Sequence, residues 1–279
     1  MELRSHNLSP LKKQYLSDSL SKRDFFEIVA HVLNKGWQDL VHCPEESVSR
    51  DDFIKIEVLL EKKISGMPFA RVLGYVDFYD ARIELDENVL IPRPETEILF
   101  DKVLKRVSSR SISVVFDICT GSGCLGIAYK KKNPSCEVYL SDISKEALEN
   151  AASNALLNQV NVSLIESDLL KYFPKELRAD LVFCNPPYIS KNEYASLDKS
   201  VHEHDPKLAL IAEDNGLGVY KRLSLELPGY LSPGALVALE IGYMQKDSVK
   251  EIFSSSVWKE IICEKDFAGL DRFIFLELH

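Results

Sequence analysis

Hydrophobic positions in the first 75 residues recur at the three- and four-residue spacing that is typical of amphipathic helices. Between Ser21 and Asn34 this spacing is kept by Phe25, Phe26, Val29, Val32 and Leu33. Ser9-Pro10 predicts another helix start, and Ser49-Arg50-Asp51-Asp52 fits a capping box before a third helix. We therefore expect residues 1–75 to form a small helical domain.

Residues 76–111 are expected to connect this domain to the rest of the chain. Apolar and polar positions alternate around Asp86-Glu87-Asn88, which predicts a β-hairpin or a connector with strand content. The segment Pro92-Arg93-Pro94-Glu95-Thr96-Glu97 then predicts a helix from Glu97 to about Arg106.

From residue 112 onward, short apolar runs alternate with helical patterns. The apolar runs lie at 112–118, 136–142, 162–166, 180–184 and 235–241, and the helical patterns at 124–132, 144–157 and 217–231. This alternation predicts an α/β domain over residues 112–279, with a parallel sheet covered by helices on both faces. Two further strands, 257–263 and 272–278, have no full helix between them, so we expect one to be antiparallel.

Composition narrows the classes of protein. The chain is 46% hydrophobic and 28% charged, as in ordinary globular proteins, and its net charge of −9 argues against nucleic-acid binding. Apolar runs are too short for a membrane helix, and the first residues lack the apolar core of a signal peptide. The six cysteines, Cys43 among them, show no zinc spacing, and His202 and His204 lack a third ligand nearby. We expect a reduced cytoplasmic protein without a metal.

A glycine-rich loop follows the first strand of the α/β domain. Gly121, Gly123 and Gly126 match the pattern GxGxxG between a strand and a helix. Asp142 ends the next strand, where it can accept hydrogen bonds from ribose hydroxyls. These features predict an adenosine-containing ligand, and they fit both NAD and S-adenosylmethionine.

Carboxylates near this loop favour one of the two ligands. A pyrophosphate prefers a loop without carboxylates, because the helix N-terminus already supplies the anion site. Asp117, Asp142 and Asp168 each follow a strand beside the loop. This arrangement favours a ligand with an ammonium and a sulfonium, although Asp117 and Asp168 could instead serve only as caps.

The strand at 180–184 runs directly into Asn185-Pro186-Pro187-Tyr188, at the sheet edge where such folds bind ligands. Asn185 offers a side-chain oxygen, Pro186 a backbone carbonyl and Tyr188 a flat ring. Two acceptors and a ring can hold a planar –NH2 group and direct its lone pair towards a methyl donor. The acceptors also stabilise the positive charge that develops during methyl transfer. On its own, Asn-Pro-Pro would indicate only a turn.

At these residues the sequence resembles the class I S-adenosylmethionine-dependent methyltransferases, and within them the release factor glutamine methyltransferases (the HemK/PrmC family). The resemblance covers nearly the whole chain. It includes VLIPRPETEILF at 89–100, DICTGSGCLGIA at 117–128, SDIS at 141–144, NPPYIS at 185–190, HDPKLAL at 204–210, NGLGVYKRL at 215–223, EIG at 240–242 and KDFAGLDRF at 265–273. It implies a Rossmann-like seven-stranded methyltransferase sheet with the last strand antiparallel, preceded by a helical domain.

The resemblance also implies roles for individual residues. The residues expected to bind the cofactor are Asp117, Cys119, Thr120, Gly121, Ser122, Gly123, Asp142, Asp168, Leu169 and Asn185. Those expected to bind the substrate are Arg93, Glu95, Asn185, Pro186, Pro187 and Tyr188, with Asn185, Pro186 and Tyr188 catalytic. Arg93 and Glu95 could equally mark only a helix start. Cys119 stands where the family more often has glycine, and Leu169 where an aromatic can occur.

The implied reaction transfers a methyl group from S-adenosyl-L-methionine, leaving S-adenosyl-L-homocysteine. The implied acceptor is the glutamine side-chain amide in the Gly-Gly-Gln loop of class I peptide chain release factors, with residues 1–75 as a docking surface. A ribosomal-protein glutamine methyltransferase remains an alternative. A DNA adenine amino-methyltransferase would share the tetrapeptide, but the chain is acidic and lacks a basic target-recognition domain. An NAD-dependent oxidoreductase would leave Asn185 to Tyr188 without a role.

Overall fold

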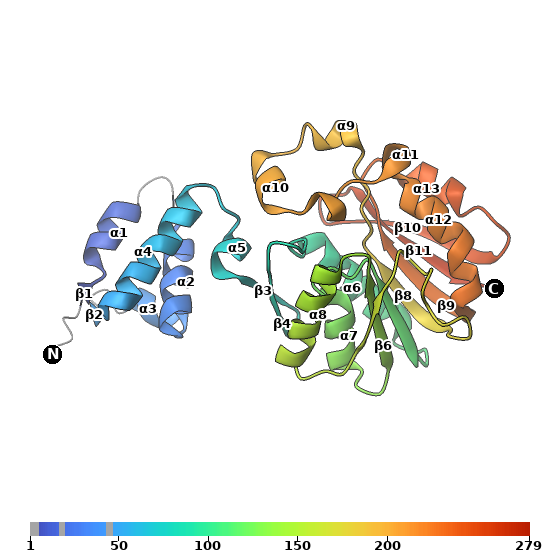
Figure 1. The fold of residues 1–279 in the computed structure, drawn as a ribbon, viewed down its shortest axis with the longest axis horizontal. Helices are drawn as coiled ribbons and strands as arrows, with labels where there is room; N and C mark the ends of the chain where they lie inside the picture. The colour runs from blue at the N-terminus through green and yellow to red at the C-terminus, as the bar shows by residue number, and fades with distance from the viewer. Residues whose placement is uncertain (1–5, 17–19, 43–46) are drawn as a thin grey trace. The chain divides into compact units, whose positions relative to one another are not determined.

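The computed structural model describes residues 6–16, 20–42 and 47–279 of the 279-residue chain. The chain divides into two compact units, Met1–Gly74 and Tyr75–His279 (Figure 1). Cys43 lies outside the described residues, and the cysteines within them are free thiols. No helix in the described ranges has the length and apolarity that a membrane crossing requires.

The smaller unit is helical, as expected. Its elements are β1 (His6–Asn7), α1 (Ser9–Tyr15), α2 (Lys22–Leu33), α3 (Trp37–His42), β2 (Ser47–Val48), α4 (Arg50–Ile64) and α5 (Phe69–Leu73). Its core forms where α2 and α4 bury apolar side chains, including Phe25, Ile28, Ile56 and Leu60. The repeating apolar positions of the sequence therefore become the buried faces of two long helices.

Hydroxyl side chains cap the two long helices. Ser21 accepts the backbone N–H of Asp24, and Ser49 accepts that of Asp52, each at 3.0 Å. Ser49 also donates its hydroxyl to the Asp52 carboxylate at 2.7 Å. The expected capping box is therefore only half formed, because the Asp52 carboxylate bonds the Ser49 hydroxyl and not the Ser49 backbone N–H. The predicted start of the first helix at Ser9-Pro10 is confirmed, but Ser9 does not cap it: Ser9 is already helical, and its N–H is accepted by Asn7 Oδ1.

The larger unit begins with a hairpin and a helix. Strand β3 (Tyr75–Phe78) pairs antiparallel with β4 (Ala81–Glu84), and α6 spans Pro94–Val107. The hairpin is confirmed, but its turn lies at Tyr79-Asp80 instead of at Asp86-Glu87-Asn88. Asp86 instead accepts the N–H of Asn88 at 2.8 Å and forms a local turn in the loop that follows the hairpin. Helix α6 starts three residues before the predicted Glu97, because Pro94 has the fixed φ that suits a first helical turn.

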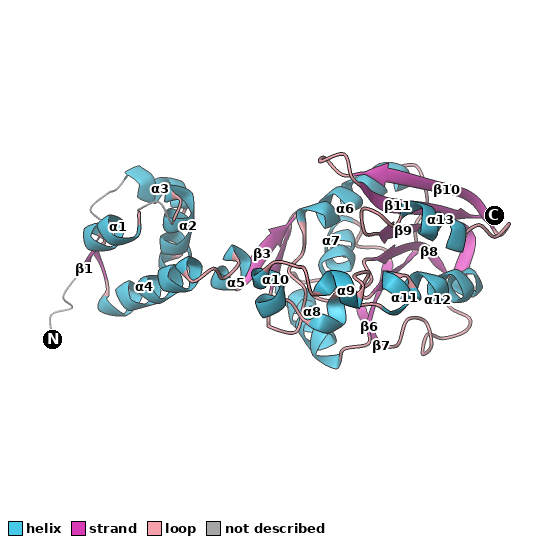
Figure 2. Ribbon diagram, turned by 90° about the horizontal axis from the view of Figure 1, so that it is seen from above, coloured by secondary structure: helices cyan, strands magenta, loops and turns pink. Residues whose placement is uncertain are grey.

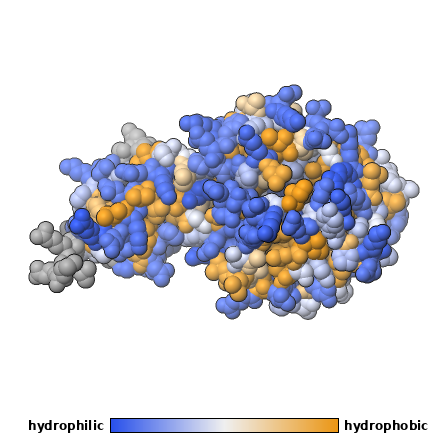
Figure 3. All heavy atoms as spheres, viewed as in Figure 1, coloured by the Kyte–Doolittle hydropathy of each residue, from blue (hydrophilic) through white to orange (hydrophobic). Residues whose placement is uncertain are grey.

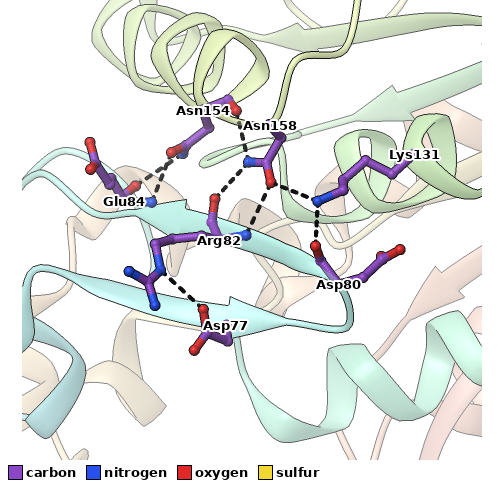
Figure 4. A network of polar contacts seen from close by, with 7 residues as sticks. All are labelled: Asp77, Asp80, Arg82, Glu84, Lys131, Asn154 and Asn158. Carbon is purple, nitrogen blue, oxygen red and sulfur yellow. Dashed lines mark hydrogen bonds and ion pairs between the residues drawn. The ribbon is translucent and has the colours of Figure 1, made fainter. Parts of the chain in front are cut away.

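Two asparagines connect this hairpin to the α/β layer (Figure 4). Asn154 lies in α8 (Lys145–Leu157), and Asn158 is the C-cap of that helix. Asn158 accepts the N–H of Arg82 at 3.1 Å and donates to its carbonyl at 2.6 Å. Asn154 does the same for Glu84, at 2.8 and 3.0 Å, and also donates to the carbonyl of Ser122 at 2.9 Å. The two side-chain amides thus take the place of a neighbouring strand along β4.

We expect Asn154→Ala to destabilise the larger unit. The change leaves the buried carbonyl of Ser122 and the part-buried backbone groups of Glu84 without their partner, at about 1–3 kcal/mol for a fully buried unsatisfied group. Urea denaturation of the full chain measures the loss. Asn158→Ala is the matched control with a smaller expected loss, because Asn158 is half-exposed and water can replace its amide. Equal midpoints for Asn154→Ala and the unchanged protein would contradict this assignment.

A seven-stranded sheet forms the centre of the larger unit (Figure 2). Its strands are β5 (Val114–Ile118), β6 (Glu137–Asp142), β7 (Ser163–Glu166), β8 (Ala179–Cys184), β9 (Leu231–Glu240), β10 (Trp258–Lys265) and β11 (Asp271–Leu278). They lie in the order β10-β11-β9-β8-β5-β6-β7, and β11 runs antiparallel to both of its neighbours. The predicted sheet with an antiparallel last strand is confirmed.

Helices cover both faces of this sheet (Figures 1 and 2). One apolar layer joins α6, α7 (Cys124–Lys132) and α8 to alternate strand residues such as Val115 and Phe183. The other joins α12 (Gly218–Glu226) and α13 (Lys246–Ile252) to the residues between them, such as Phe116 and Val182. Because both faces are buried, strands such as β5 and β8 are apolar at nearly every position, which made them recognisable in the sequence.

The remaining elements lie in the loops after β8. They are α9 (Lys191–Tyr194), α10 (Lys199–His204) and α11 (Glu213–Gly216), with short 3-10 turns at Lys207–Ala209 and Leu227–Tyr230. The helix predicted over 217–231 therefore ends at Glu226, where Pro228 interrupts the backbone hydrogen bonds of a helix. Strand β9 then starts at Leu231, four residues before the predicted 235.

Candidate active site

A cavity of about 240 Å³ opens in the larger unit beside the carboxyl ends of β5, β6 and β8. The predicted residues that line it are Asp117, Cys119, Thr120, Gly121, Ser122, Asp142, Asp168, Leu169, Asn185 and Pro187. Gly123, Pro186 and Tyr188 adjoin these residues in the chain but do not line the cavity, and neither do Arg93 and Glu95. The structure therefore brings the predicted cofactor loop and the Asn-Pro-Pro-Tyr segment to one place.

Asp117 binds the glycine loop to the first turn of α7 through its buried carboxyl group. Its side chain is only 1% exposed, and Oδ2 accepts the hydroxyl of Thr120 at 2.7 Å and the N–H of Gly126 at 2.9 Å. Burial raises the pKa of Asp117 to about 7, while these two hydrogen bonds act in the opposite direction. A carboxyl group therefore already occupies the first turn of α7, the place where a dinucleotide pyrophosphate would need the free helix N-terminus.

Glycine is required at two points of the loop for different reasons. Gly121 has a φ of +53°, and a Cβ added there would meet no described atom within 4 Å, so its backbone lies open to the cavity. A Cβ on Gly126 would lie 2.2 Å from Leu140 Cδ2, so this glycine lets α7 pack closely on the sheet. The loop thus offers bare backbone to a ligand, as the sequence pattern predicted.

Cys119 adopts a backbone conformation that suits glycine better. Its φ is +58°, in the left-handed region, where a residue with a Cβ loses roughly 1–2 kcal/mol. The substitution of cysteine for the more common glycine therefore introduces strain at the first residue after β5. Leu169, the other departure from the family pattern, also has a positive φ, of +55°.

Asp142 is positioned by backbone donors on both sides. Oδ2 accepts the N–H of Gly121 at 2.9 Å, and Oδ1 accepts that of Ser144 at 3.0 Å. Burial raises the pKa of Asp142, and the backbone hydrogen bonds oppose that shift. Each carboxylate oxygen keeps a second lone pair, so Asp142 can still accept two hydroxyl hydrogens from a ligand in the cavity.

Asp168 carries a partner that the sequence did not indicate. Arg222, on α12, donates to Asp168 Oδ1 at 2.7 Å, and both residues line the cavity. The turn after β7 is capped by the Ser167 hydroxyl, which accepts the N–H of Tyr172 at 3.0 Å. The three carboxyl groups do line one cavity, but Arg222 pairs with Asp168, and burial raises the pKa of Asp117 to about 7. The negative charge offered to a ligand is therefore smaller than the sequence alone suggests.

The Asn185 side chain is oriented by Thr96 of α6. Its Nδ2 donates to Thr96 Oγ1 at 3.4 Å, and the Thr96 hydroxyl donates in turn to Glu240 Oε2 at 2.9 Å. Because the amide nitrogen faces Thr96, the Asn185 oxygen is the end available to accept a hydrogen from a ligand. Thr96 lines the cavity with Asn185, although the sequence indicated only a helix start at this position.

Tyr188 is fixed through its backbone. Its carbonyl accepts the side-chain N–H of Gln245 at 2.9 Å, and its hydroxyl lies 3.4 Å from Glu240 Oε1. A Cβ on Gly216 would lie 2.1 Å from the Tyr188 carbonyl oxygen, so only glycine fits there. The glycine at position 216, in the NGLG block of the sequence, therefore allows the backbone of the Asn-Pro-Pro-Tyr segment to pack closely against it.

Arg93 forms an ion pair instead of lining the cavity. Its Nη2 lies 2.6 Å from Asp205 Oδ2, and Asp205 Oδ1 accepts the N–H of Ile91 at 3.4 Å. This contact joins the two family blocks at 89–100 and 204–210.

His202 packs edge-on against Tyr194, with ring centroids 4.4 Å apart. The described residues contain no cluster of three potential metal ligands.

Comparisons with known proteins indicate a methyltransferase. The family described as "Methyltransferase small domain" matches residues 95–204. A methyltransferase structure from Pyrococcus furiosus, 21% identical, aligns with a TM-score of 0.54 over 80% of this chain and 97% of that one, which supports the fold.

Relatives in sequence are more specific. A "Release factor glutamine methyltransferase" of Lactococcus lactis is 36% identical and covers 88% of this chain and 89% of its own length. One of the same name from Chlamydia trachomatis is 39% identical and covers 78% of this chain and 74% of its own. With the fold and the site on which its motifs converge, these matches place the chain in the family of release factor glutamine methyltransferases.

Proposed function

We propose that this protein transfers a methyl group from S-adenosyl-L-methionine to the side-chain amide nitrogen of the glutamine in the Gly-Gly-Gln loop of class I peptide chain release factors. The observation that carries the proposal is the orientation of Asn185, whose amide nitrogen is turned to Thr96 so that its oxygen can accept from a target amide. An amide-binding group then lies in the same cavity as the glycine loop.

The residues present fit the proposed cofactor. The Gly121 backbone is open to the cavity, and Asp142 has lone pairs for the two ribose hydroxyls. Asp168 and Leu169 line the side of the cavity that we assign to adenine. The bound cofactor supplies the methyl group. Because the Asp117 carboxyl group accepts a backbone N–H in the first turn of α7, the same place disfavours a pyrophosphate and therefore disfavours NAD.

The protein's own contribution to the chemistry is positioning. An amide nitrogen is a poor nucleophile because its lone pair is delocalised into the carbonyl group. Acceptors on Asn185 and Pro186 would each take one N–H of the target amide and hold it for transfer. The same acceptors stabilise the positive charge that grows on the nitrogen as the methyl arrives. The methylated nitrogen then releases its surplus, strongly acidic proton to water, so a strong general base is not needed.

We expect Asp142→Ala to weaken cofactor binding by about 1.5–3 kcal/mol, the range for hydrogen bonds to a charged group. The lost groups would be the ribose acceptor and the anchor of the Gly121 N–H. Titration calorimetry with S-adenosylmethionine measures the change, and NAD serves as the comparison ligand. Binding of NAD without binding of S-adenosylmethionine would contradict the cofactor assignment.

The small unit is our candidate for docking the release factor. A glutamine on a folded protein needs a contact surface larger than a tetrapeptide. Exposed apolar side chains are present on this unit (Figure 3), and on α4 they include Ile54 and Val58, which are 47% and 43% exposed. Residues four apart share one face of a helix, so the two side chains are presented on the same face of α4.

We expect the double variant Ile54→Ser/Val58→Ser to raise the KM for an intact release factor about tenfold, equivalent to about 1.4 kcal/mol. Cofactor affinity and the KM for a short Gly-Gly-Gln peptide are expected to stay unchanged, since neither involves the docking surface. Leu225→Ser, at an 84% exposed position on α12, is the matched control. An unchanged KM for the intact factor in the double variant would remove α4 from the docking surface.

Methyl transfer to competing acceptors tests the proposed function. The purified protein is incubated with labelled S-adenosylmethionine and a class I release factor, a ribosomal-protein mixture or duplex DNA. We expect label in the release factor. Label in DNA would favour the adenine alternative. The charge of the chain argues against that alternative: residues 1–74 hold eleven basic and eleven acidic residues, so the net charge of −9 lies entirely in residues 75–279. Neither part therefore has the basic excess that DNA binding requires.

A further inference from the structure

A buried carboxyl group lies behind the Asn-Pro-Pro-Tyr segment. Glu240, the last residue of β9, is only 2% exposed. Its Oε2 accepts the Thr96 hydroxyl at 2.9 Å, and its Oε1 accepts the Tyr188 hydroxyl at 3.4 Å. Burying a carboxyl group costs free energy that its hydrogen bonds must offset. Neither cofactor binding nor the amide contacts described above require this group, so its role needs a separate explanation.

The hydrogen bonds from Asn185 to Glu240 run in one direction. A threonine hydroxyl has a single proton, and the Thr96 proton is donated to Glu240. Its lone pairs are therefore left to accept from Asn185 Nδ2. An Asn185 amide turned by 180° would set its oxygen against these lone pairs, which is unfavourable. The acceptor at Glu240 thus decides which end of the Asn185 amide faces the cavity.

We propose that Glu240 is a positioning residue for methyl transfer, which acts through Thr96 to hold the Asn185 oxygen towards the target amide. The inference rests on the proposed function for its effect on rate. The positioning itself is a property of this chain and is measurable without an acceptor protein. Neither Glu240 nor Thr96 needs to contact the reacting atoms, so their effect is expected on alignment and not on proton transfer.

The protonation state of Glu240 makes this positioning sensitive to pH. Burial raises the pKa of Glu240 to about 7, while the Thr96 hydrogen bond, Arg272 and Tyr188 act to lower it and Glu95 to raise it. The titratable groups around it are Glu95 on α6, Cys124 on α7, Tyr188 after β8, Tyr220 on α12 and Arg272 on β11.

The sign of the effect follows from that shift. Above about pH 7 Glu240 is a carboxylate, and both of its oxygens accept. Below that pH one of these oxygens becomes a hydroxyl that donates a hydrogen bond, so a single carbonyl oxygen remains as the strong acceptor for the two hydroxyls of Thr96 and Tyr188. Alignment of Asn185 is therefore expected to improve as the pH rises through about 7 and to weaken as the pH falls.

The Asn185 side-chain amide gives a direct signal for this coupling. Its ¹H–¹⁵N resonances, assigned with Asn185→Ala, are followed in the full chain between about pH 5.5 and 8.5, on both sides of the raised pKa. We expect them to shift with a midpoint near 7 in the unchanged protein and in Thr96→Ser, which keeps the hydroxyl. The shift should vanish in Glu240→Gln and in Thr96→Val.

Rates complete the test. With an active acceptor, kcat in Glu240→Gln and Thr96→Val is expected to fall about 10- to 100-fold, the scale of a small misplacement, with calorimetric cofactor affinity within about twofold. Thr96→Ser should retain most of the rate. If Glu240→Gln fails to fold, Thr96→Val still tests the proposal, because it breaks the same link and leaves Glu240 unchanged. An Asn185 amide that does not titrate, or full activity in Thr96→Val, would overturn the proposal. If the unchanged protein methylates no release factor, the proposed function fails, while the resonance shift still decides the positioning.

Discussion

Asn185→Ala is expected to lower kcat by about 10²–10³, the usual loss when one preorganised polar contact to a transition state is removed. The variant loses the side-chain oxygen that we assign to the target amide. Its partner Thr96 stays in place, and Asp142 and the glycine loop are untouched, so cofactor affinity should change much less. Rates at saturating S-adenosylmethionine and release factor, with calorimetric cofactor affinity, separate the two effects.

Asn161→Ala, at an exposed position remote in sequence from the motif, is the matched control and should keep the full rate. A loss of cofactor affinity as large as the loss of kcat in Asn185→Ala would instead assign Asn185 to cofactor binding. Retained kcat would remove the amide-acceptor role altogether.

Tyr188→Ala should be severe and Tyr188→Phe mild. The ring is assigned a packing role beside the target amide, and its removal is expected to lower kcat about 100-fold through misplacement of the acceptor. Phenylalanine keeps the ring and loses only the hydroxyl, which donates to the buried Glu240 and not to a residue that lines the cavity. Burial and Glu240 both raise the pKa of the Tyr188 hydroxyl, so it stays neutral and makes a poor base at ordinary pH.

Rates of the two variants under identical saturating conditions provide the comparison. If Tyr188→Phe is as damaging as Tyr188→Ala, the hydroxyl takes part in the chemistry or in holding Glu240, and the packing role is wrong.

The core of the fold was predictable because its strands are buried on both faces. Runs such as Val114–Ile118 and Ala179–Cys184 are apolar at nearly every position, and helices with clear periodicity separate them. The hairpin turn was misplaced because the polar segment Asp86-Glu87-Asn88 gave the stronger turn signal. The chain actually turns at Tyr79-Asp80, where Tyr79 has a positive φ. This conformation is uncommon for tyrosine, so the residue type gives no turn signal.

The site was predictable where its residues follow strands. Asp117, Asp142 and Asn185 come at the carboxyl ends of three parallel strands, so they must meet at one edge of the sheet. Partners from distant parts of the chain were not predictable: Thr96 meets Glu240 across 144 residues, and Asp168 meets Arg222 across 54. Such contacts depend on how α6 and α12 lie on the sheet.

One signal could have pointed to Glu240. It ends the apolar run ALVALE at the same sheet edge as the other strand-end residues, where an acidic side chain would be buried. Arg93 shows the opposite case, because a charged residue in a family block suggested the cavity while the structure pairs it with Asp205.

The central claim is that a glutamine side-chain amide is the methyl acceptor. Its most direct test is tandem mass spectrometry of a class I release factor after incubation with this protein and isotopically labelled S-adenosylmethionine. We predict one labelled methyl group, on the side-chain nitrogen of the glutamine in the Gly-Gly-Gln loop, and none when that glutamine is replaced. A methyl group at another residue, or an unmodified factor alongside a methylated ribosomal protein or DNA, would contradict the account.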